Sequence, residues 1–253
     1  MKFSSRYQIE IPDVDVLTYV LGSPATTDDG FVFVDAEKQA DGISKAQLED
    51  LVRKLADGLR NTIGFQDNDV VLAFTENCLW YPVIILAAIC AGGAFTGASP
   101  VYTTMELARH LRISGAACIF TDQQRLDIAI EAADTAGLPR TSIVLVDQDM
   151  VTPGFHQIRD LLDVPYPWEV INDPKPLANK IAVLNFSSGT TGNPKACMIT
   201  HRNLVANSEQ QLYLDEVARS RSPISKQAAT QIHCAFLPLY HASKLTVPIR
   251  VPY

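Results

Sequence analysis

The fold of this chain is constrained most strongly by short apolar runs that alternate with longer helical segments between residues 70 and 146. Four runs have the length of buried strands, at 70–74, 95–98, 118–121 and 142–146. The segments between them have the length and spacing of helices, at 79–91, 103–114 and 123–136. Alternating strands and helices are typical of a parallel sheet covered by helices. The sequence therefore predicts an α/β fold with parallel-sheet layers covered by helices.

Polar residues and glycines mark the helix boundaries. Ser44 with Gln47, and Thr103 with Glu106, have the spacing of capping boxes, in which two side chains satisfy free N–H groups at a helix start. The first of these helices has an apolar face at helical spacing, formed by Leu48, Leu51, Val52, Leu55, Leu59 and Ile63. Gly64 is placed to end that helix, because glycine readily adopts the conformation of a C-terminal cap.

Composition shifts indicate how the chain is divided. Residues 1–30 mix prolines, aspartates and a few apolar pairs, which predicts an N-terminal arm packed on the core. Prolines cluster between 164 and 180, which predicts a linker. The predicted organisation is a first α/β subdomain with its arm over 1–163, a Pro-rich linker over 164–180, a phosphate-binding hairpin and the start of a second α/β subdomain over 181–242, and an atypical tail over 243–253.

The second part of the chain is expected to begin with two strands, at 181–186 and 196–199. Thr200 is placed to cap a helix that reaches about residue 218. A polar, mobile loop is expected at 219–231, followed by a last apolar strand at 233–239.

A loop rich in hydroxyls and glycines connects the strands at 181–186 and 196–199. We call residues 187–195 the phosphate loop, after seven of its members: Ser187, Ser188, Gly189, Thr190, Thr191, Gly192 and Lys195. Glycines let backbone N–H groups approach an anion closely, and the hydroxyls add donors and can ligate Mg²⁺. The lysine supplies a positive charge for phosphate oxygens. The pattern predicts a phosphate-binding site.

This loop differs from the commoner nucleotide-binding loop. The Walker pattern places four residues between its glycines and a Lys-Ser/Thr pair directly after the second one. Here two residues separate Gly189 from Gly192, and Pro194 prevents a helix from running through the loop. A kinase-like phosphate binder is disfavoured, because no acidic Mg²⁺ ligand follows an apolar strand at a suitable place. A plain surface turn between two strands is the structural alternative.

The phosphate loop and the segment 200–204, Thr-His-Arg-Asn-Leu, resemble the phosphate-binding signature of adenylate-forming enzymes. That superfamily includes acyl- and aryl-CoA synthetases, beetle luciferases and adenylation domains of peptide synthetases. Three further stretches resemble 4-coumarate-CoA-ligase-like members in the expected order, at 91–107, 114–121 and 237–242. The resemblance covers roughly residues 40 to 242. It implies that the chain is the N-terminal portion of an acid–CoA ligase, a truncated large N-terminal domain.

The resemblance implies a reaction in which a carboxylate attacks the α-phosphate of Mg·ATP and a thiol, usually coenzyme A, then takes the acyl group. Thr190 and Thr191 would bind phosphate or Mg²⁺, and the backbones of Gly189 and Gly192 would wrap the β- and γ-phosphates. Lys195 would contact the pyrophosphate. His241 would line the acyl-substrate side, although an ordinary histidine at a strand end is the structural alternative. Lys195 and His241 are thus the catalytic candidates.

The resemblance stops before the family's adenine, ribose and catalytic-lysine segments, and the residues after His241 depart from the family pattern. We therefore expect a chain that cannot complete adenylation alone and whose second half is marginally stable. A non-catalytic remnant or interaction module, with weak or no nucleotide binding, is the alternative. Aryl, medium-chain and fatty acids all remain open as substrates, and so does the oligomeric state.

The net charge and the cysteine spacing indicate which partners and which cellular compartment to expect. The formal net charge of −7 argues against nucleic acid as a main partner. The longest apolar run, at 83–95, is too short to span a bilayer, so no transmembrane segment is expected. The five cysteines are widely spaced, which suggests a reduced intracellular, cytoplasmic setting and no disulfide framework. The C-terminus carries no peroxisomal address.

The remaining histidines receive structural interpretations. His110 is expected on the surface of its helix, and His201 is expected to be structural or to face solvent. His156 and His233 have no partner at a spacing typical of metal ligands, so no histidine-based metal site is predicted.

Overall fold

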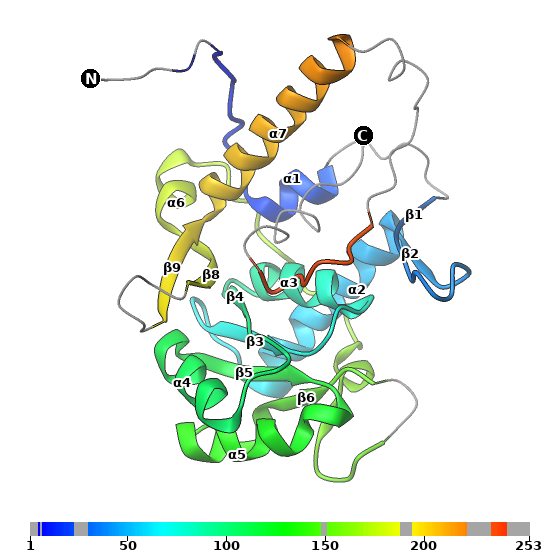
Figure 1. The fold of residues 1–253 in the computed structure, drawn as a ribbon, viewed down its shortest axis with the longest axis vertical. Helices are drawn as coiled ribbons and strands as arrows, with labels where there is room; N and C mark the ends of the chain where they lie inside the picture. Colours follow the sequence, from blue (N-terminus) through cyan, green and yellow to red (C-terminus); the bar gives the residue numbers. More distant parts are fainter. Residues whose placement is uncertain are drawn as a thin grey trace.

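The computed structural model describes residues 5, 7–22, 30–147, 151–187, 194–221 and 234–241. Within these residues one large sheet has the strand order β7-β6-β5-β3-β4-β8-β9 (Figure 1). Its strands are β3 (Val70–Phe74), β4 (Ala94–Gly97), β5 (Ala116–Thr121), β6 (Ile143–Leu145), β7 (His156–Gln157), β8 (Ile181–Ser187) and β9 (Lys195–Thr200). Neighbouring strands are parallel except for the antiparallel pair of β8 and β9. The predicted α/β class with a parallel sheet is confirmed.

Helices cover both faces of this sheet. One face packs against α2 (Lys45–Gly58) and α3 (Trp80–Cys90), and the other against α4 (Thr104–Ser114) and α5 (Leu126–Ala136). Side chains of a strand point alternately to the two faces. In β3, Val71 and Ala73 join the core beside α3, whereas Leu72 and Phe74 join the core beside α4 and α5. A strand buried on both sides explains the unbroken apolar run of β3.

Helix starts and ends lie where the capping residues in the sequence predicted them. Both capping boxes form, with the side chain of Ser44 at the start of α2 and that of Thr103 at the start of α4. The helix from residue 45 does not end as a regular α-helix, because it continues into a π-helical turn, η1 (Leu59–Ile63). Gly64 then ends it with φ 81°, in the left-handed region that favours glycine. Shorter 3₁₀ turns are η2 (Gln123–Arg125), η3 (Arg140–Ser142) and η4 (Ile158–Leu161).

The N-terminal region holds more structure than the predicted arm. A short helix, α1 (Val16–Gly22), buries its apolar side chains in the core beside α3. Seven residues give too few turns for a clear helical pattern, which is why the sequence did not reveal it. After it, β1 (Phe31–Val34) pairs with β2 (Gly42–Ser44) in a small antiparallel sheet.

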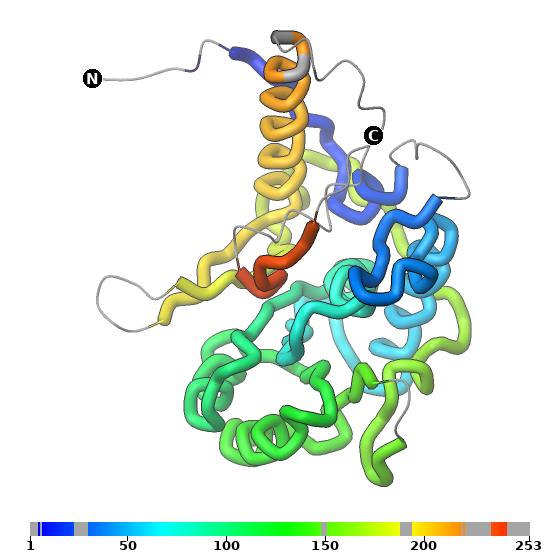
Figure 2. Tube along the Cα trace, turned by 45° about the vertical axis from the view of Figure 1, so that its right-hand side comes forward, coloured from blue at the N-terminus to red at the C-terminus, as the bar shows by residue number. Residues whose placement is uncertain are grey.

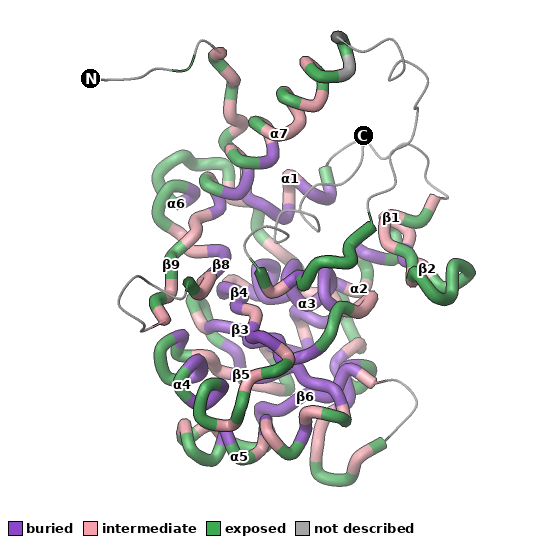
Figure 3. Tube along the Cα trace, viewed as in Figure 1, coloured by how far each residue is buried: buried purple, intermediate pink, exposed green. Residues whose placement is uncertain are grey.

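The hairpin of β8 and β9 extends the large sheet, because Val183 of β8 pairs with Phe95 of β4. Before it, residues 165–173 form loop structure and α6 (Pro174–Asn179) follows. After it comes α7 (His201–Arg221), which projects from the body in Figure 2. Its first turns bury Leu204 and Val205, whereas residues 209–218 occupy partly buried and exposed positions (Figure 3). The division into subdomains stays a prediction.

Two expectations for the last third of the chain need correction. The helix expected to stop near 218 continues to Arg221, and the rest of the expected mobile loop, at 222–231, lies outside the described residues. The strand expected at 233–239 is wrong for residues 234–239, which have no regular secondary structure apart from a bend at Leu237 and a turn that begins at Leu239. Their backbone groups bond to a side chain, Asn77, rather than to a neighbouring strand. The predicted tail at 243–253 lies outside the described part.

Candidate functional site

The carboxyl ends of the parallel strands define one edge of the sheet. β3, β4 and β8 end there at Phe74, Gly97 and Ser187. In open α/β sheets, ligands bind in the crevice outside the carboxyl ends of the strands. The loops that leave this edge therefore carry the first candidates for a binding site.

The two ends of the phosphate loop meet at this edge. Ser187 is the last residue of β8, Lys195 is the first of β9, and the two are cross-strand partners in the antiparallel ladder. Both residues are exposed, so the hydroxyl and the ammonium group are available to a ligand. The other predicted members of the loop lie outside the described residues: Ser188, Gly189, Thr190, Thr191 and Gly192.

His110 fixes the strand that leads into the phosphate loop. Its ring stacks on Phe186 of β8, with centroids 3.6 Å apart and an interplanar angle of 27°. Its Nε2 lies 2.8 Å from Oγ1 of Thr96, and that hydroxyl donates to the carbonyl of Leu184 at 2.7 Å. A hydroxyl has a single proton, so Nε2 of His110 is the donor in the first bond. Thr96 and His110 therefore join β4 and α4 to β8.

The surface position expected for His110 is wrong, because the residue is 2 % exposed. It lies on the face of α4 that turns toward the β8–β9 hairpin, which a single-helix pattern does not reveal. Burial lowers the pKa of His110 to about 3, so the ring is neutral at physiological pH. His201 is buried too, which corrects the solvent-facing alternative and agrees with a structural role.

Asn77 attaches residues 234–241 to the same edge. Asn77 follows β3, and its Nδ2 donates to the carbonyls of Ala235 and Leu237 at 2.9 and 3.0 Å. Its Oδ1 accepts from the backbone N–H of Leu239 at 2.9 Å. One amide thus satisfies three backbone groups of a segment more than 150 residues away in the chain.

Within residues 234–241, Tyr240 contacts the end of β4. Its backbone and Cβ lie so close to Gly97 that a Cβ added at Gly97 would stand 2.7 Å from Cβ of Tyr240. The hydroxyl of Ser99 donates to the phenol oxygen of Tyr240 at 3.3 Å. His241 follows directly, is exposed, and donates its backbone N–H to the carbonyl of Pro238 at 3.2 Å. The predicted acyl-side histidine therefore lies at the carboxyl edge, as Ser187 and Lys195 do.

A partly buried arginine links the loops that follow three strands. Arg125 donates to Asp122, after β5, at 2.6 Å and to the carbonyl of Pro100, after β4, at 3.0 Å. It also pairs with Glu76, after β3. Asp122 accepts in addition from the hydroxyl of Thr75 at 3.0 Å. Charge-assisted bonds of this kind are stronger than neutral ones, so the network stiffens the edge.

The sequence did not reveal the contacts made by Asn77 and Arg125, or the burial of His110 against β8. A signal existed for Asn77, because polar residues directly after a buried parallel strand lie at the ligand-binding edge. None existed for the partners of Arg125, which are brought together only by the strand order. Among the described residues, no group of three or more His, Cys, Asp or Glu side chains could hold a metal ion.

The fold and this edge define the class of protein: an α/β protein with a phosphate-loop hairpin, built like the N-terminal domains of adenylate-forming enzymes. The family model described as "AMP-binding enzyme" matches residues 23–252. The chain belongs to the AMP-binding enzyme family.

Curated relatives are ligases of coenzyme A. Phenylacetyl-CoA ligase epaB of Aspergillus niger is 34% identical over 211 residues, which cover 81% of this chain and 39% of that protein. 4-Coumarate–CoA ligase 3 of Oryza sativa subsp. japonica is 30% identical over 200 residues, covering 79% of this chain and 33% of the relative. The chain thus spans 40% or less of the length of these relatives.

Solved structures agree with the fold. ATP-bound MatB from Rhodopseudomonas palustris superposes with a TM-score of 0.69 at 26% identity, over 94% of this chain and 43% of that protein. A luciferase-like enzyme from the Zophobas morio mealworm superposes with a TM-score of 0.75 over 98% of this chain and 54% of its own, at 16% identity. In the described part of this chain, no helix combines the length and apolar character needed to cross a membrane.

Proposed function

We propose that this chain carries the ATP-binding and acid-binding edge of an acid–CoA ligase that activates a carboxylic acid as an acyl-adenylate. The observation that carries the proposal is the pairing of Ser187 with Lys195 at the mouth of the phosphate loop. The antiparallel ladder holds the lysine beside a loop of glycines and hydroxyls, where phosphate charge would be neutralised by a nearby cation. Similarity to CoA ligases supports the reaction class.

In this proposal Lys195 contacts the pyrophosphate part of ATP. The hydroxyls of Thr190 and Thr191 bind phosphate or Mg²⁺, and Ser187 and Ser188 add hydrogen bonds. The backbones of Gly189 and Gly192 approach the β- and γ-phosphates. The exposed ammonium and hydroxyl groups at the loop's ends fit such a ligand. Magnesium, when bound with ATP, neutralises phosphate charge.

His241 is proposed to line the acid-binding side. Its support is the anchoring of residues 234–241 by Asn77 and the contact of Tyr240 with Gly97, which together keep this segment at the carboxyl edge. The acyl acceptor would be coenzyme A, as the names of the relatives indicate for those proteins. Phenylacetate and 4-coumarate are named only for the relatives. For this chain we propose a carboxylic acid without specifying its class.

The proposed setting is the reducing cytoplasm. Its support comes from the cysteines among the described residues, which are all free thiols. Burial raises the pKa of the Cys78 thiol to about 11 and that of Cys90 to about 12, as for cysteines that serve in packing.

Calorimetric titration with MgATP and MgAMP tests the proposal on this chain. We expect MgATP to bind roughly tenfold or more tightly than MgAMP, because the phosphate loop contacts the β- and γ-phosphates. Equal affinities would contradict a triphosphate-binding loop. Binding of neither nucleotide would favour the alternative, a remnant or interaction module without nucleotide binding.

A second assay addresses catalysis. The chain spans 40% or less of its relatives, and we propose that residues beyond this span complete adenylation in those proteins. ATP–pyrophosphate exchange with a panel of aryl, medium-chain and fatty acids is therefore expected to stay at background for residues 1–253. Exchange that an acid stimulates, and that Lys195→Ala abolishes, would contradict this incompetence while supporting the ligase assignment.

A further inference from the structure

A cavity of about 320 Å³ lies at the edge of the sheet opposite to the phosphate loop. Three of its lining residues come shortly before parallel strands: Asp67 before β3, Gly92 before β4 and Lys180 directly before β8. They therefore lie at the amino ends of these strands, whereas Ser187 and Gly97 lie at the carboxyl ends. The cavity is thus separate from the proposed nucleotide site.

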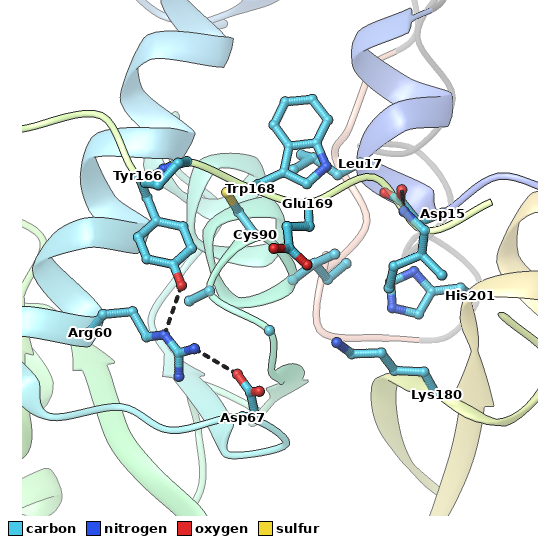
Figure 4. Close-up of a pocket in the computed structure, with 15 residues that line it drawn as sticks. Asp15, Leu17, Arg60, Asp67, Cys90, Tyr166, Trp168, Glu169, Lys180 and His201 are labelled. Atoms are coloured by element: carbon cyan, nitrogen blue, oxygen red, sulfur yellow. Dashed lines mark hydrogen bonds and ion pairs between the residues drawn. The ribbon is translucent and has the colours of Figure 1, made fainter. Parts of the chain in front are cut away.

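The cavity has a fixed cover, which we call the strap and define as residues 166–171. At one end the backbone N–H of Tyr166 donates to the carbonyl of Arg53 at 3.0 Å, and Nε of Arg53 donates back to the carbonyl of Tyr166 at 3.1 Å. At the other end Asp15 and Ile171 exchange two hydrogen bonds of 3.0 Å. Figure 4 shows the strap crossing the cavity between these two ends.

His201 presents a hydrogen-bond donor to the cavity. The backbone N–H of Val16 donates to its Nδ1 at 3.2 Å, so Nδ1 is unprotonated and the neutral ring carries its proton on Nε2. The residue is 1 % exposed, it lines the cavity, and Nε2 has no hydrogen-bond partner among the described residues. A buried N–H without an acceptor is unfavourable, so a ligand that accepts from it would be favoured.

Trp168 presents a second donor. Its indole Nε1 is buried, and it too lacks a partner among the residues described. Trp168 belongs to the strap, on the other side of the cavity from Lys180 in Figure 4. In that view the indole lies on the far side of the strap from Lys180 and His201, so Trp168 lines the cavity and can report on it without meeting the same ligand atom as His201.

Some charged side chains around the cavity are already bonded to other protein groups, and others can bind a ligand. Arg60 is engaged by Asp67 at 2.6 Å, by the phenol oxygen of Tyr166 at 3.3 Å and by the carbonyl of Phe65 at 3.2 Å. The carboxylate of Asp15 accepts three hydrogen bonds, two from Thr18 and one from Ile171.

Lys180 and Glu169 are the two available charges. In Figure 4 the ammonium of Lys180 reaches toward the space below the strap, near the His201 ring. Burial lowers the pKa of His201 most, the nearby Asp15 carboxylate opposes this, and the Lys180 charge lowers the pKa further. Glu169 points into the same space, but the residue is exposed and its carboxylate can turn to solvent.

We propose that this cavity binds a small oxyanion, a phosphate or carboxylate group, which accepts a hydrogen bond from Nε2 of His201 and pairs with Lys180 beneath the strap that carries Trp168. An anion with several lone pairs can accept from the buried N–H of His201 and from the ammonium of Lys180 together. Glu169 competes with the ligand for Lys180. The site does not depend on the proposed nucleotide function, because it uses other residues at the opposite edge of the sheet.

The two tryptophans of the chain provide a local readout. In a ¹⁵N–¹H spectrum each indole gives one signal, and Trp80→Phe identifies the signal of Trp168. We expect inorganic phosphate to shift the Trp168 indole signal saturably. Trp80, at the start of α3 and after β3, reports the carboxyl edge. In Lys195→Ala the Trp168 response is expected to persist, which separates this site from the phosphate loop.

Charge variants supply the decisive comparison. Lys180→Met should raise the Kd for phosphate about tenfold, the effect of removing one charge-assisted bond. The matched Lys175→Met, on exposed α6, should leave it unchanged. Glu169→Gln, at an exposed residue that does not threaten folding, should lower the Kd about threefold because a competing charge is removed.

Acetate, titrated in parallel, distinguishes a carboxylate from a phosphate ligand, and saturation by either one supports the site. Absence of a saturable Trp168 shift with both anions would overturn the proposal. Equal affinities in Lys180→Met, Glu169→Gln and the unaltered protein would overturn it as well.

Discussion

The imidazole of His110 stacks on the ring of Phe186 at a centroid distance of 3.6 Å, one residue before the phosphate loop begins. Through Thr96 the same imidazole is connected to the carbonyl of Leu184. The position of the β8–β9 hairpin is therefore set by α4 and β4, and not by backbone pairing alone, which is limited to one residue pair between β4 and β8.

Acid should destabilise the fold through His110. Burial lowers its pKa from 6.5 to about 3. Between pH 6.5 and pH 3 this residue is therefore protonated in the unfolded chain but neutral in the folded chain. The stability is complete above about pH 6.5 and is lost as the pH falls toward 3. At pH 5 the loss from this residue is about 2 kcal/mol. Urea unfolding at pH 7.5 and pH 5 measures it.

His110→Phe keeps an aromatic ring beside Phe186 but cannot titrate. The variant should lose less stability than the unaltered protein between pH 7.5 and pH 5. Some pH dependence should remain, because burial lowers the pKa of His201 to about 4. Identical pH dependence in the two proteins would show that His110 is not the buried neutral base described above.

Asn77→Ala should release residues 234–241. The variant loses an amide that satisfies three backbone groups, and we expect a cost of about 0.5–1.5 kcal/mol, because the bonds to Ala235 and Leu237 are exposed and water can replace the amide there. Limited proteolysis should cut within this segment faster than in the unaltered protein. Asn61→Ala is the matched control, since Asn61 is exposed and its amide bonds only to Asp57 among the contacts described. Equal cleavage rates in both variants would contradict the role of Asn77.

Gly97→Ala should displace Tyr240. An added Cβ would stand 2.6 Å from the Tyr81 hydroxyl and 2.7 Å from Cβ of Tyr240, closer than real contacts allow. Overpacking of this kind costs about 1–3 kcal/mol. Gly22→Ala has no neighbouring atom within 4 Å and should leave the unfolding midpoint unchanged. Comparison of the two midpoints checks the close approach of residues 234–241 to β4.

Arg125→Met should weaken the carboxyl edge more than loss of a surface ion pair does. The side chains of Arg125 and Asp122 are each 13% exposed, so loss of one partner should cost more than the roughly 0–1 kcal/mol of an exposed pair and less than the roughly 3–5 kcal/mol of a fully buried one. Arg140→Met removes an exposed pair with Asp134 and should leave the thermal midpoint unchanged. Similar midpoints for the two variants would contradict a stabilising role for the partly buried Arg125 network.

The strands and helices of the large sheet could be predicted because local signals and the global fold agree there. Val70–Phe74 is apolar on both faces, as a strand covered on both sides must be. Thr103 and Glu106 mark the start of α4 by chemistry that acts within one turn. Both features depend on neighbours in the sequence.

The contacts at the site depend on neighbours in space instead. His110 looks like an ordinary surface residue of an amphipathic helix until β8 is placed against α4. Residues 234–239 look like a strand, but their backbone groups are satisfied by Asn77, so no ladder forms. The pairing of Ser187 with Lys195 follows from the hairpin register, which the sequence suggested through two strands around the phosphate loop.

The central claim, that Lys195 at the mouth of the phosphate loop holds the triphosphate of ATP, is tested most directly by the affinity of MgATP for Lys195→Ala. Lys175→Ala is the matched control, because it removes an exposed lysine on α6. We predict that Lys195→Ala raises the Kd roughly tenfold or more, the loss of one charge-assisted contact, and that Lys175→Ala leaves the Kd unchanged. A Kd that is the same in all three proteins would contradict the account.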